Sequence, residues 1–134
     1  MIIEDYISFE TAKLLKEKGF VQPTRHYYSY DGRLGYAASE YNWNQTTGHY
    51  CDYSCISLQM AMKWLREVHG LHINLDIHWL HFANLNGWAY LIEKILDNGV
   101  EYIDSKGDEN DKAFYSTYEE ACEAAIKYCL ENLI

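Results

Sequence analysis

The feature that most constrains this fold is a stretch of strict alternation. Residues 71–79 read LHINLDIHW, in which apolar and polar side chains alternate over nine positions. Successive side chains of a β-strand point to opposite faces, so this pattern predicts a strand with one buried and one solvated face. We expect four apolar side chains to turn inward beneath a layer of helices, namely Ile73, Leu75, Ile77 and Trp79. The histidines His72 and His78 fall on the solvated face.

Other segments carry strand and turn signals. They are an apolar run at 87–92, the Asn98-Gly99 dipeptide followed by 100–103, and the segments 25–30 and 33–37 on either side of Asp31-Gly32. Asn-Gly and Asp-Gly between apolar segments favour tight turns that join antiparallel strands. The sequence therefore predicts antiparallel hairpins in both halves of the chain.

Three segments have the periodicity and capping residues of amphipathic helices. They run from Ser8 to Gly19, from about Ser57 to His69 before Gly70, and from the Tyr115–Glu120 region toward the last residues. Ser8 can accept hydrogen bonds from free backbone amides at the start of the first segment, and Gly19 after it can adopt the left-handed conformation. The second segment ends at Gly70. The third segment begins with two overlapping capping boxes, Ser116 with Glu119 and Thr117 with Glu120.

Together these elements predict the fold class. A chain of 134 residues has the size of one domain, and we see no linker or repeat that divides residues 1–134. Helices at both ends with strands between them favour an α+β fold. We expect an antiparallel β-sheet of about 3–5 strands, with the N-terminal, central and C-terminal helices packed on one face.

Tyrosines are concentrated between residues 26 and 53, among Asn, Gln, Thr, Ser and Gly. Aromatic rings with a polar group suit surfaces that are partly dry and partly wet, and they are enriched at protein interfaces. We therefore predict a partner-binding surface formed by Tyr28, Tyr30, Tyr36, Tyr41, Trp43 and Tyr50. The alternative is that these rings are core and hairpin residues, because aromatic side chains also favour strands.

The charge is unevenly distributed. The net charge is −9; residues 1–70 hold 7 basic and 8 acidic side chains, whereas residues 71–134 hold 4 and 12. An acidic chain lacks the basic footprint that nucleic acids and anionic membranes require, so we predict neither as a partner. The first residues do not resemble a signal peptide, and no apolar run is long enough to span a bilayer. We expect a cytoplasmic protein with reduced cysteines.

Histidines and cysteines are the only candidates for a reactive or metal site. The candidates are His69, His72, His78, His81, Cys51 and Cys55. A metal ion needs three or four converging ligands, and neighbours on one strand face are too far apart to supply them alone. Whether these side chains converge stays open, and we predict no catalytic residue, no metal ligand and no cofactor. The alternative is a small metal-dependent or Cys/His enzyme, built on His26, His49, Cys51, His72 or His78.

Three segments carry a family resemblance. Residues 7–20, 63–69 and 115–121 resemble small uncharacterised proteins encoded by phages and mobile elements of gut Bacteroidetes-type bacteria. That family has no established activity to transfer. The resemblance implies a phage or mobile-element origin and a bacterial host cytosol.

These observations lead to one functional hypothesis. We expect a non-enzymatic binding protein that acts through an acidic, Tyr-rich surface and inhibits a basic host protein, because complementary charge selects partners and speeds encounter. Alternatively, the charge only keeps a tyrosine-rich protein soluble. A homo-oligomeric structural protein, such as a homodimer formed through the tyrosines, is a further alternative.

Overall fold

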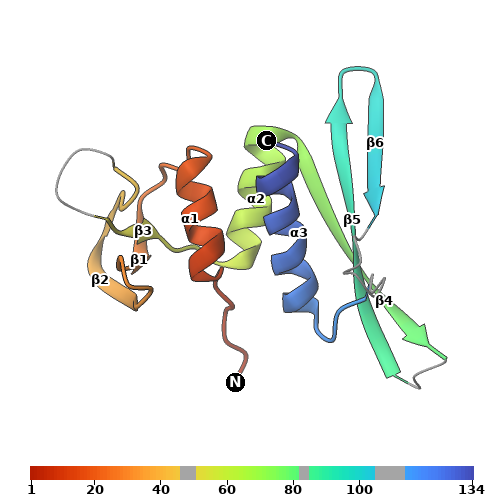
Figure 1. Ribbon diagram of the computed structural model, residues 1–134, viewed down its shortest axis with the longest axis horizontal. Helices are drawn as coiled ribbons and strands as arrows, with labels where there is room; N and C mark the ends of the chain where they lie inside the picture. The colour runs from red at the N-terminus through yellow and green to blue at the C-terminus, as the bar shows by residue number, and fades with distance from the viewer. Residues whose placement is uncertain (46–50, 82–84, 105–113) are drawn as a thin grey trace.

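Three helices form the middle layer of the molecule (Figure 1), in a computed structural model that describes residues 1–45, 51–81, 85–104 and 114–134. The helices are α1 (Phe9–Glu17), α2 (Leu58–His69) and α3 (Tyr118–Asn132). The side chains of Ser8, Ser57 and Thr117 each accept a hydrogen bond from a backbone amide three residues later. Of the two overlapping capping boxes, the structure uses the one that starts at Thr117.

Both predicted glycine positions at helix ends are confirmed. Gly19 and Gly70 have positive φ angles of 91° and 65°, a backbone conformation that is costly for residues with a Cβ atom. At Gly70 the chain leaves α2 and enters the alternating strand at once. The glycine therefore fixes where the C-terminal sheet starts relative to the helices.

The strands form two antiparallel sheets. The N-terminal sheet has the order β2-β1-β3 and the C-terminal sheet the order β4-β5-β6. Their bounds are β1 (Thr24–Tyr28), β2 (Leu34–Tyr41), β3 (Tyr53–Ser54), β4 (Leu71–Leu80), β5 (Leu85–Leu96) and β6 (Gly99–Asp104). The predicted α+β class is confirmed, but the expected single sheet is two sheets of three strands each. The reason lies in the layering, because the helices separate the two sheets (Figure 1).

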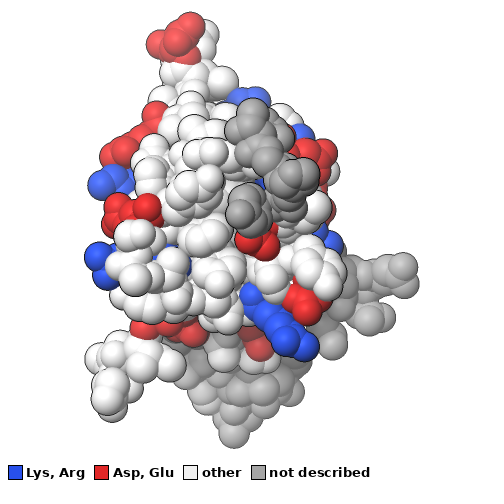
Figure 2. All heavy atoms as spheres, turned by 90° about the vertical axis from the view of Figure 1, so that its left-hand side faces the viewer, with Lys and Arg blue, Asp and Glu red and all other residues white. Residues whose placement is uncertain are grey.

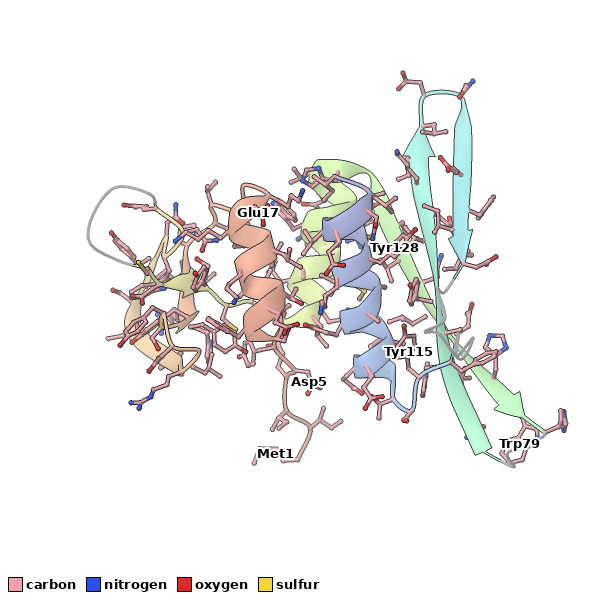
Figure 3. The ribbon with its side chains drawn as sticks, in the orientation of Figure 1. Met1, Asp5, Glu17, Trp79, Tyr115 and Tyr128 are labelled. Atoms are coloured by element: carbon pink, nitrogen blue, oxygen red, sulfur yellow. The ribbon has the colours of Figure 1, made fainter. Side chains whose placement is uncertain are left out.

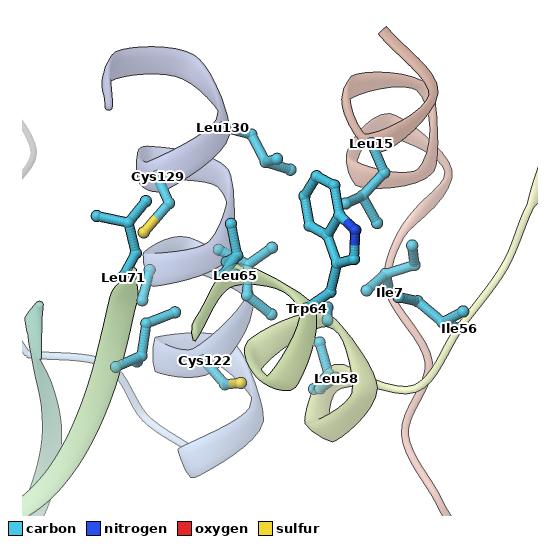
Figure 4. Close-up of a cluster of buried hydrophobic side chains, with 14 of the residues drawn as sticks. Ile7, Leu15, Ile56, Leu58, Trp64, Leu65, Leu71, Cys122, Cys129 and Leu130 are labelled. Carbon is cyan, nitrogen blue, oxygen red and sulfur yellow. The ribbon is translucent and has the colours of Figure 1, made fainter. Parts of the chain in front are cut away.

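The helices cover one face of each sheet. α2 and α3 pack against β4 and β5, while α1 packs against β3 and against α3. A core of buried apolar side chains fills the space between them (Figure 4). Across the C-terminal sheet the core row is Ile73, Ile92 and Ile103, which stand opposite one another in register.

The strand predicted from the alternation of residues 71–79 is confirmed, but the burial that we expected for Ile77 and Trp79 is wrong. Leu71 and Ile73 are buried and Leu75 is half-buried, whereas Ile77 is 54% and Trp79 49% exposed. Figure 3 shows Trp79 far from α3. Here the β4–β5 hairpin extends beyond the N-terminal end of that helix, which lies near Tyr115. The first half of β4 is therefore covered by helices and the second half is not.

Candidate binding surface

An aromatic cluster lies on the N-terminal sheet. The rings of Tyr27 and Trp43 are stacked with centroids 4.2 Å apart and planes 25° apart. Tyr41 meets Trp43 edge-on at 5.1 Å. The indole Nε1 of Trp43 donates a hydrogen bond of 2.9 Å to the carbonyl oxygen of Thr24, on the neighbouring strand. The cluster thus has its orientation fixed by backbone as well as by ring contacts.

A glycine explains how Tyr27 can lie flat on the sheet. Gly35 of β2 stands directly opposite Tyr27 of β1. A Cβ atom at Gly35 would be 2.5 Å from the Tyr27 ring, closer than nonbonded atoms approach. Only glycine leaves the space that this ring occupies, so the position of the ring depends on residue 35.

A hollow of about 370 Å³ opens beside the cluster, lined by Ala37, Ser39, Tyr41 and Trp43. It follows from a register shift between β1 and β2, because His26 pairs with Tyr36 whereas Thr24 pairs with Tyr41. The four residues 37–40 of β2 therefore stand opposite a single residue of β1. Such bulges redirect side chains at sheet edges, and β2 is an edge strand. We call the three rings of Tyr27, Tyr41 and Trp43 with this hollow the aromatic surface.

The predicted partner-binding residues are distributed over several places. Tyr41 and Trp43 belong to the aromatic surface, and Tyr30 is exposed in the turn after β1. Tyr36 is exposed and accepts a hydrogen bond from the Arg25 guanidinium at 3.2 Å. Tyr50 lies outside the described residues.

Tyr28 faces the interior. Its hydroxyl donates a 2.6 Å hydrogen bond to the Ile7 carbonyl oxygen, and its ring meets Phe9 edge-on at 5.5 Å. Burial raises the pKa of its hydroxyl to about 12, because the ionised form would lose solvation. Tyr28 therefore holds α1 against the sheet, and we do not include it in the aromatic surface.

Sequence reasoning did not single out Tyr27, which is the ring on which Trp43 stacks. A signal for it was present. Tyr27 and Tyr28 are neighbours on one strand, so one of them had to face outward. Which of the two faces the core depends on Phe9 of α1, a contact between elements that the pattern of one strand does not reveal.

The acidic and the tyrosine-rich parts of the molecule are separate. Figure 2 shows the end that carries the N-terminal sheet, where most of the described surface is uncharged. The acidic side chains of the described part of residues 71–134 lie on the other elements, namely on α3 (Glu119, Glu120, Glu123, Glu131) and on or beside β4–β6 (Asp76, Glu93, Asp97, Glu101, Asp104). The expected single acidic, Tyr-rich surface is therefore two surfaces on different elements.

A second hollow of about 560 Å³ lies between the N-terminal segment and α3. Glu123, one of the acidic residues that line it, accepts hydrogen bonds from the Ser8 amide at 3.1 Å and from the hydroxyls of Ser8 and Thr11. The partial positive charge at the start of α1 favours an anion there. Glu123 is thus engaged in joining α3 to α1.

The histidines and cysteines have separate environments. His69 packs edge-on against Trp64 at 4.7 Å and burial lowers the pKa of its imidazole. His72 contacts Asn74 Oδ1 through Nε2 at 3.2 Å, and His78 lies 5.4 Å from the Phe114 ring. His81 lies near the Trp79 ring, and His49 is outside the described residues.

Three of the four thiols are buried. Cys55, Cys122 and Cys129 are in the core, where desolvation raises each pKa to about 12, and Cys51 is exposed. Buried thiols of this kind are poor nucleophiles because the thiolate is the reactive form. In the part of the chain that the structure describes, no three His, Cys, Asp or Glu side chains are placed to hold a metal ion.

Among the described helices, none combines the length and apolarity needed to cross a bilayer. Comparison with known proteins gives no family assignment. No family model matches the chain, and neither a curated protein nor a solved structure matches it.

Proposed function

We propose that this chain is a non-enzymatic binding protein that engages a protein partner through the aromatic surface. The observation that carries the proposal is the fixed Tyr27–Trp43–Tyr41 cluster beside an open hollow. Tyrosine and tryptophan contribute most to binding where their rings fill or line a pocket at the centre of an interface.

The construction of the cluster supports this role. A ring that is already held in place loses little conformational entropy when a partner binds. The hydrogen bond from Trp43 to the Thr24 carbonyl oxygen fixes the indole ring. The Tyr27 ring occupies the space that a side chain at residue 35 would fill, and Gly35 leaves that space open. These rings are only half-buried or exposed within the chain itself, so part of their apolar surface is free to be covered.

The charge distribution supports a basic partner. We propose a host protein in the bacterial cytoplasm, bound by a protein of phage or mobile-element origin and inhibited by it. The carboxylates on α3 and β4–β6 attract a basic molecule over a distance, which raises the association rate. The aromatic surface then makes the contact that determines how long the complex lasts.

Affinity capture from a lysate of a gut Bacteroidetes-type bacterium tests the proposal. The baits are the wild type, Trp43→Ala and Gly35→Ala, whose added Cβ displaces the Tyr27 ring. Tyr102→Ala is the matched control, because Tyr102 is a 65% exposed tyrosine on β6 of the other sheet. We expect one partner to be retained by the wild type and the control, and to be lost from both aromatic-surface variants.

The kinetics separate the two contributions. For the captured partner, raising the ionic strength should lower the association rate and leave the dissociation rate nearly unchanged. Trp43→Ala should raise the dissociation rate. A partner that binds all four baits equally would contradict the assignment to the aromatic surface.

A further inference from the structure

Among the residues that the structure describes, the β4 strand has a free edge. It is the terminal strand of the order β4-β5-β6. Trp88 of β5 exchanges two backbone hydrogen bonds with Tyr115, of 2.8 and 2.7 Å, so its N–H and C=O point away from β4. Ile77 stands opposite Trp88, and in an antiparallel pair the N–H and C=O of both residues then point outward. Those of Ile77 therefore face the open edge.

The backbone N–H and C=O of every second residue of β4, including Leu75 and Trp79, face the open edge in the same way as those of Ile77. Within the described residues, no backbone hydrogen bond joins this edge of β4 to another element. In Figure 1 the end of β4 lies at the periphery of the molecule. An edge of this kind is a template on which another strand can pair.

The edge lacks most of the devices that usually protect such strands, and Asp76 is its one acidic side chain. The pairing of β4 with β5 runs without a bulge from residue 71 to 80, and the strand contains neither proline nor lysine. On the helix-facing side of its second half, Ile77 and Trp79 are 54% and 49% exposed. Exposed apolar side chains on a regular edge favour association rather than oppose it.

We propose that two copies of this chain pair through β4, antiparallel, about a two-fold axis at Ile77. In this register Asp76 of each copy stands opposite His78 of the other, and Leu75 stands opposite Trp79. Residues 74–80 of the two strands overlap. The two three-stranded sheets become one sheet of six strands, with Leu75, Ile77 and Trp79 of both copies in a continuous apolar row.

The polar side chains on the solvated face of β4 favour this register over its neighbours. An axis at Asp76 places that aspartate opposite its own copy, and an axis at His78 pairs the two His78 side chains. An axis at Leu75 places His78 opposite His72 and Asp76 opposite Asn74. The axis at Ile77 places the Asp76 carboxylate opposite the His78 imidazole, which can donate a hydrogen bond to it, and it does so twice. The axis at Asp76 instead sets like charges directly opposite, which destabilises a sheet.

Sedimentation equilibrium of the full chain tests the dimer. We expect the wild type to dimerise and Ile77→Pro to be monomeric, because proline removes the N–H that points to the open edge and none that binds β5. Ile95→Ala is the matched control, since Ile95 is a 55% exposed isoleucine on β5. It should dimerise like the wild type. Circular dichroism confirms that each variant is folded.

Charge exchange tests the register without relying on proline. Asp76→Lys and His78→Asp should each raise the dimer dissociation constant by about tenfold. Asp76→Lys removes the carboxylate that His78 faces, and His78→Asp sets two carboxylates directly opposite each other twice. The double variant Asp76→Lys/His78→Asp sets opposite charges across the two strands and should recover most of the affinity. A wild type that stays monomeric up to about 100 µM would overturn the dimer, since even weak self-association is populated there. A double variant no tighter than the single ones would overturn the register.

Discussion

At the scale of single residues, Asn44 holds the segment that carries Trp43. Its side chain is only 4% exposed, and both ends of the carboxamide are used. Nδ2 donates to the Phe20 carbonyl oxygen at 2.8 Å, and Oδ1 accepts from the Ser54 amide at 2.9 Å. One buried side chain thus joins the end of the β2 segment to β3 and to the residues that follow α1.

We predict that Asn44→Ala lowers the free energy of unfolding by about 2 kcal/mol, because a buried carbonyl and a buried amide lose their partners. Chemical denaturation measures the change. Asn132→Ala is the control, since Asn132 is exposed at the end of α3 and should cost much less. If the two variants lose the same free energy of unfolding, the buried hydrogen bonds of Asn44 stabilise the protein no more than those of an exposed asparagine, and the prediction is wrong.

At the scale of elements, the junction of α1 and α3 depends on a carboxylate. Glu123 on α3 receives hydrogen bonds from the amide and hydroxyl of Ser8 and from the hydroxyl of Thr11, which is fully buried. Ser8 is itself the N-cap of α1. The start of one helix is therefore satisfied by the side chain of another.

We expect Glu123→Ala to destabilise the protein by about 2–3 kcal/mol, since hydrogen bonds to a charged group are worth more than neutral ones. Glu123→Gln keeps one acceptor oxygen and should lose less. The control is Glu119→Ala, which removes the same charge from an exposed position on the same helix. Thermal or urea unfolding of the three variants gives the comparison, and the hypothesis fails if Glu119→Ala costs as much as Glu123→Ala.

At the scale of the whole molecule, the core determines how the fold responds to alkali. Cys55, Cys122 and Cys129 are buried, and their pKa values rise from 9.0 to about 12. A thiol whose pKa is higher in the folded than in the unfolded state is neutral in both states below about pH 9. Above that pH the unfolded state ionises first, so stability decreases until the pH passes the folded pKa.

We therefore predict that the buried thiols add no pH dependence below about pH 9. Between about pH 9 and 12 they lower the free energy of unfolding, by up to about 1.4 kcal/mol per pH unit for each buried thiol. Urea unfolding at a series of pH values measures this slope. Cys122→Ala should make the slope shallower, whereas Cys51→Ser, at an exposed thiol, should leave it unchanged. A wild-type free energy that stays constant to pH 11 would contradict the assignment.

The sequence predicted the elements well because their signals are local. Ser8, Ser57 and Thr117 cap the helices, and Gly19 and Gly70 follow the first two. These residues act within one or two turns of themselves, so no knowledge of distant segments is required. The α+β class followed from the order of the elements.

The errors arose where distant segments meet. The strand patterns do not indicate that the helices lie between the hairpin at 24–41 and the strands after residue 70. We therefore expected one sheet, whereas the structure has two. Alternation indicated which side of β4 faces the helices, but not that the helical layer leaves Ile77 and Trp79 uncovered. Likewise, the role of Tyr27 depends on Gly35, which becomes its neighbour only through strand pairing.

The sequence by itself determined the three helices with their caps and the presence of most of the strands, because capping and periodicity act between residues close in the chain. The strand ends and β3 (Tyr53–Ser54) were not predicted from it. Only the tertiary structure decided how the sheets divide, which rings stack on the outside, and that the carboxylates and the aromatic surface lie apart. The physical reason is that pairing and packing join residues far apart in sequence, and a side chain's exposure depends on what the rest of the chain places over it.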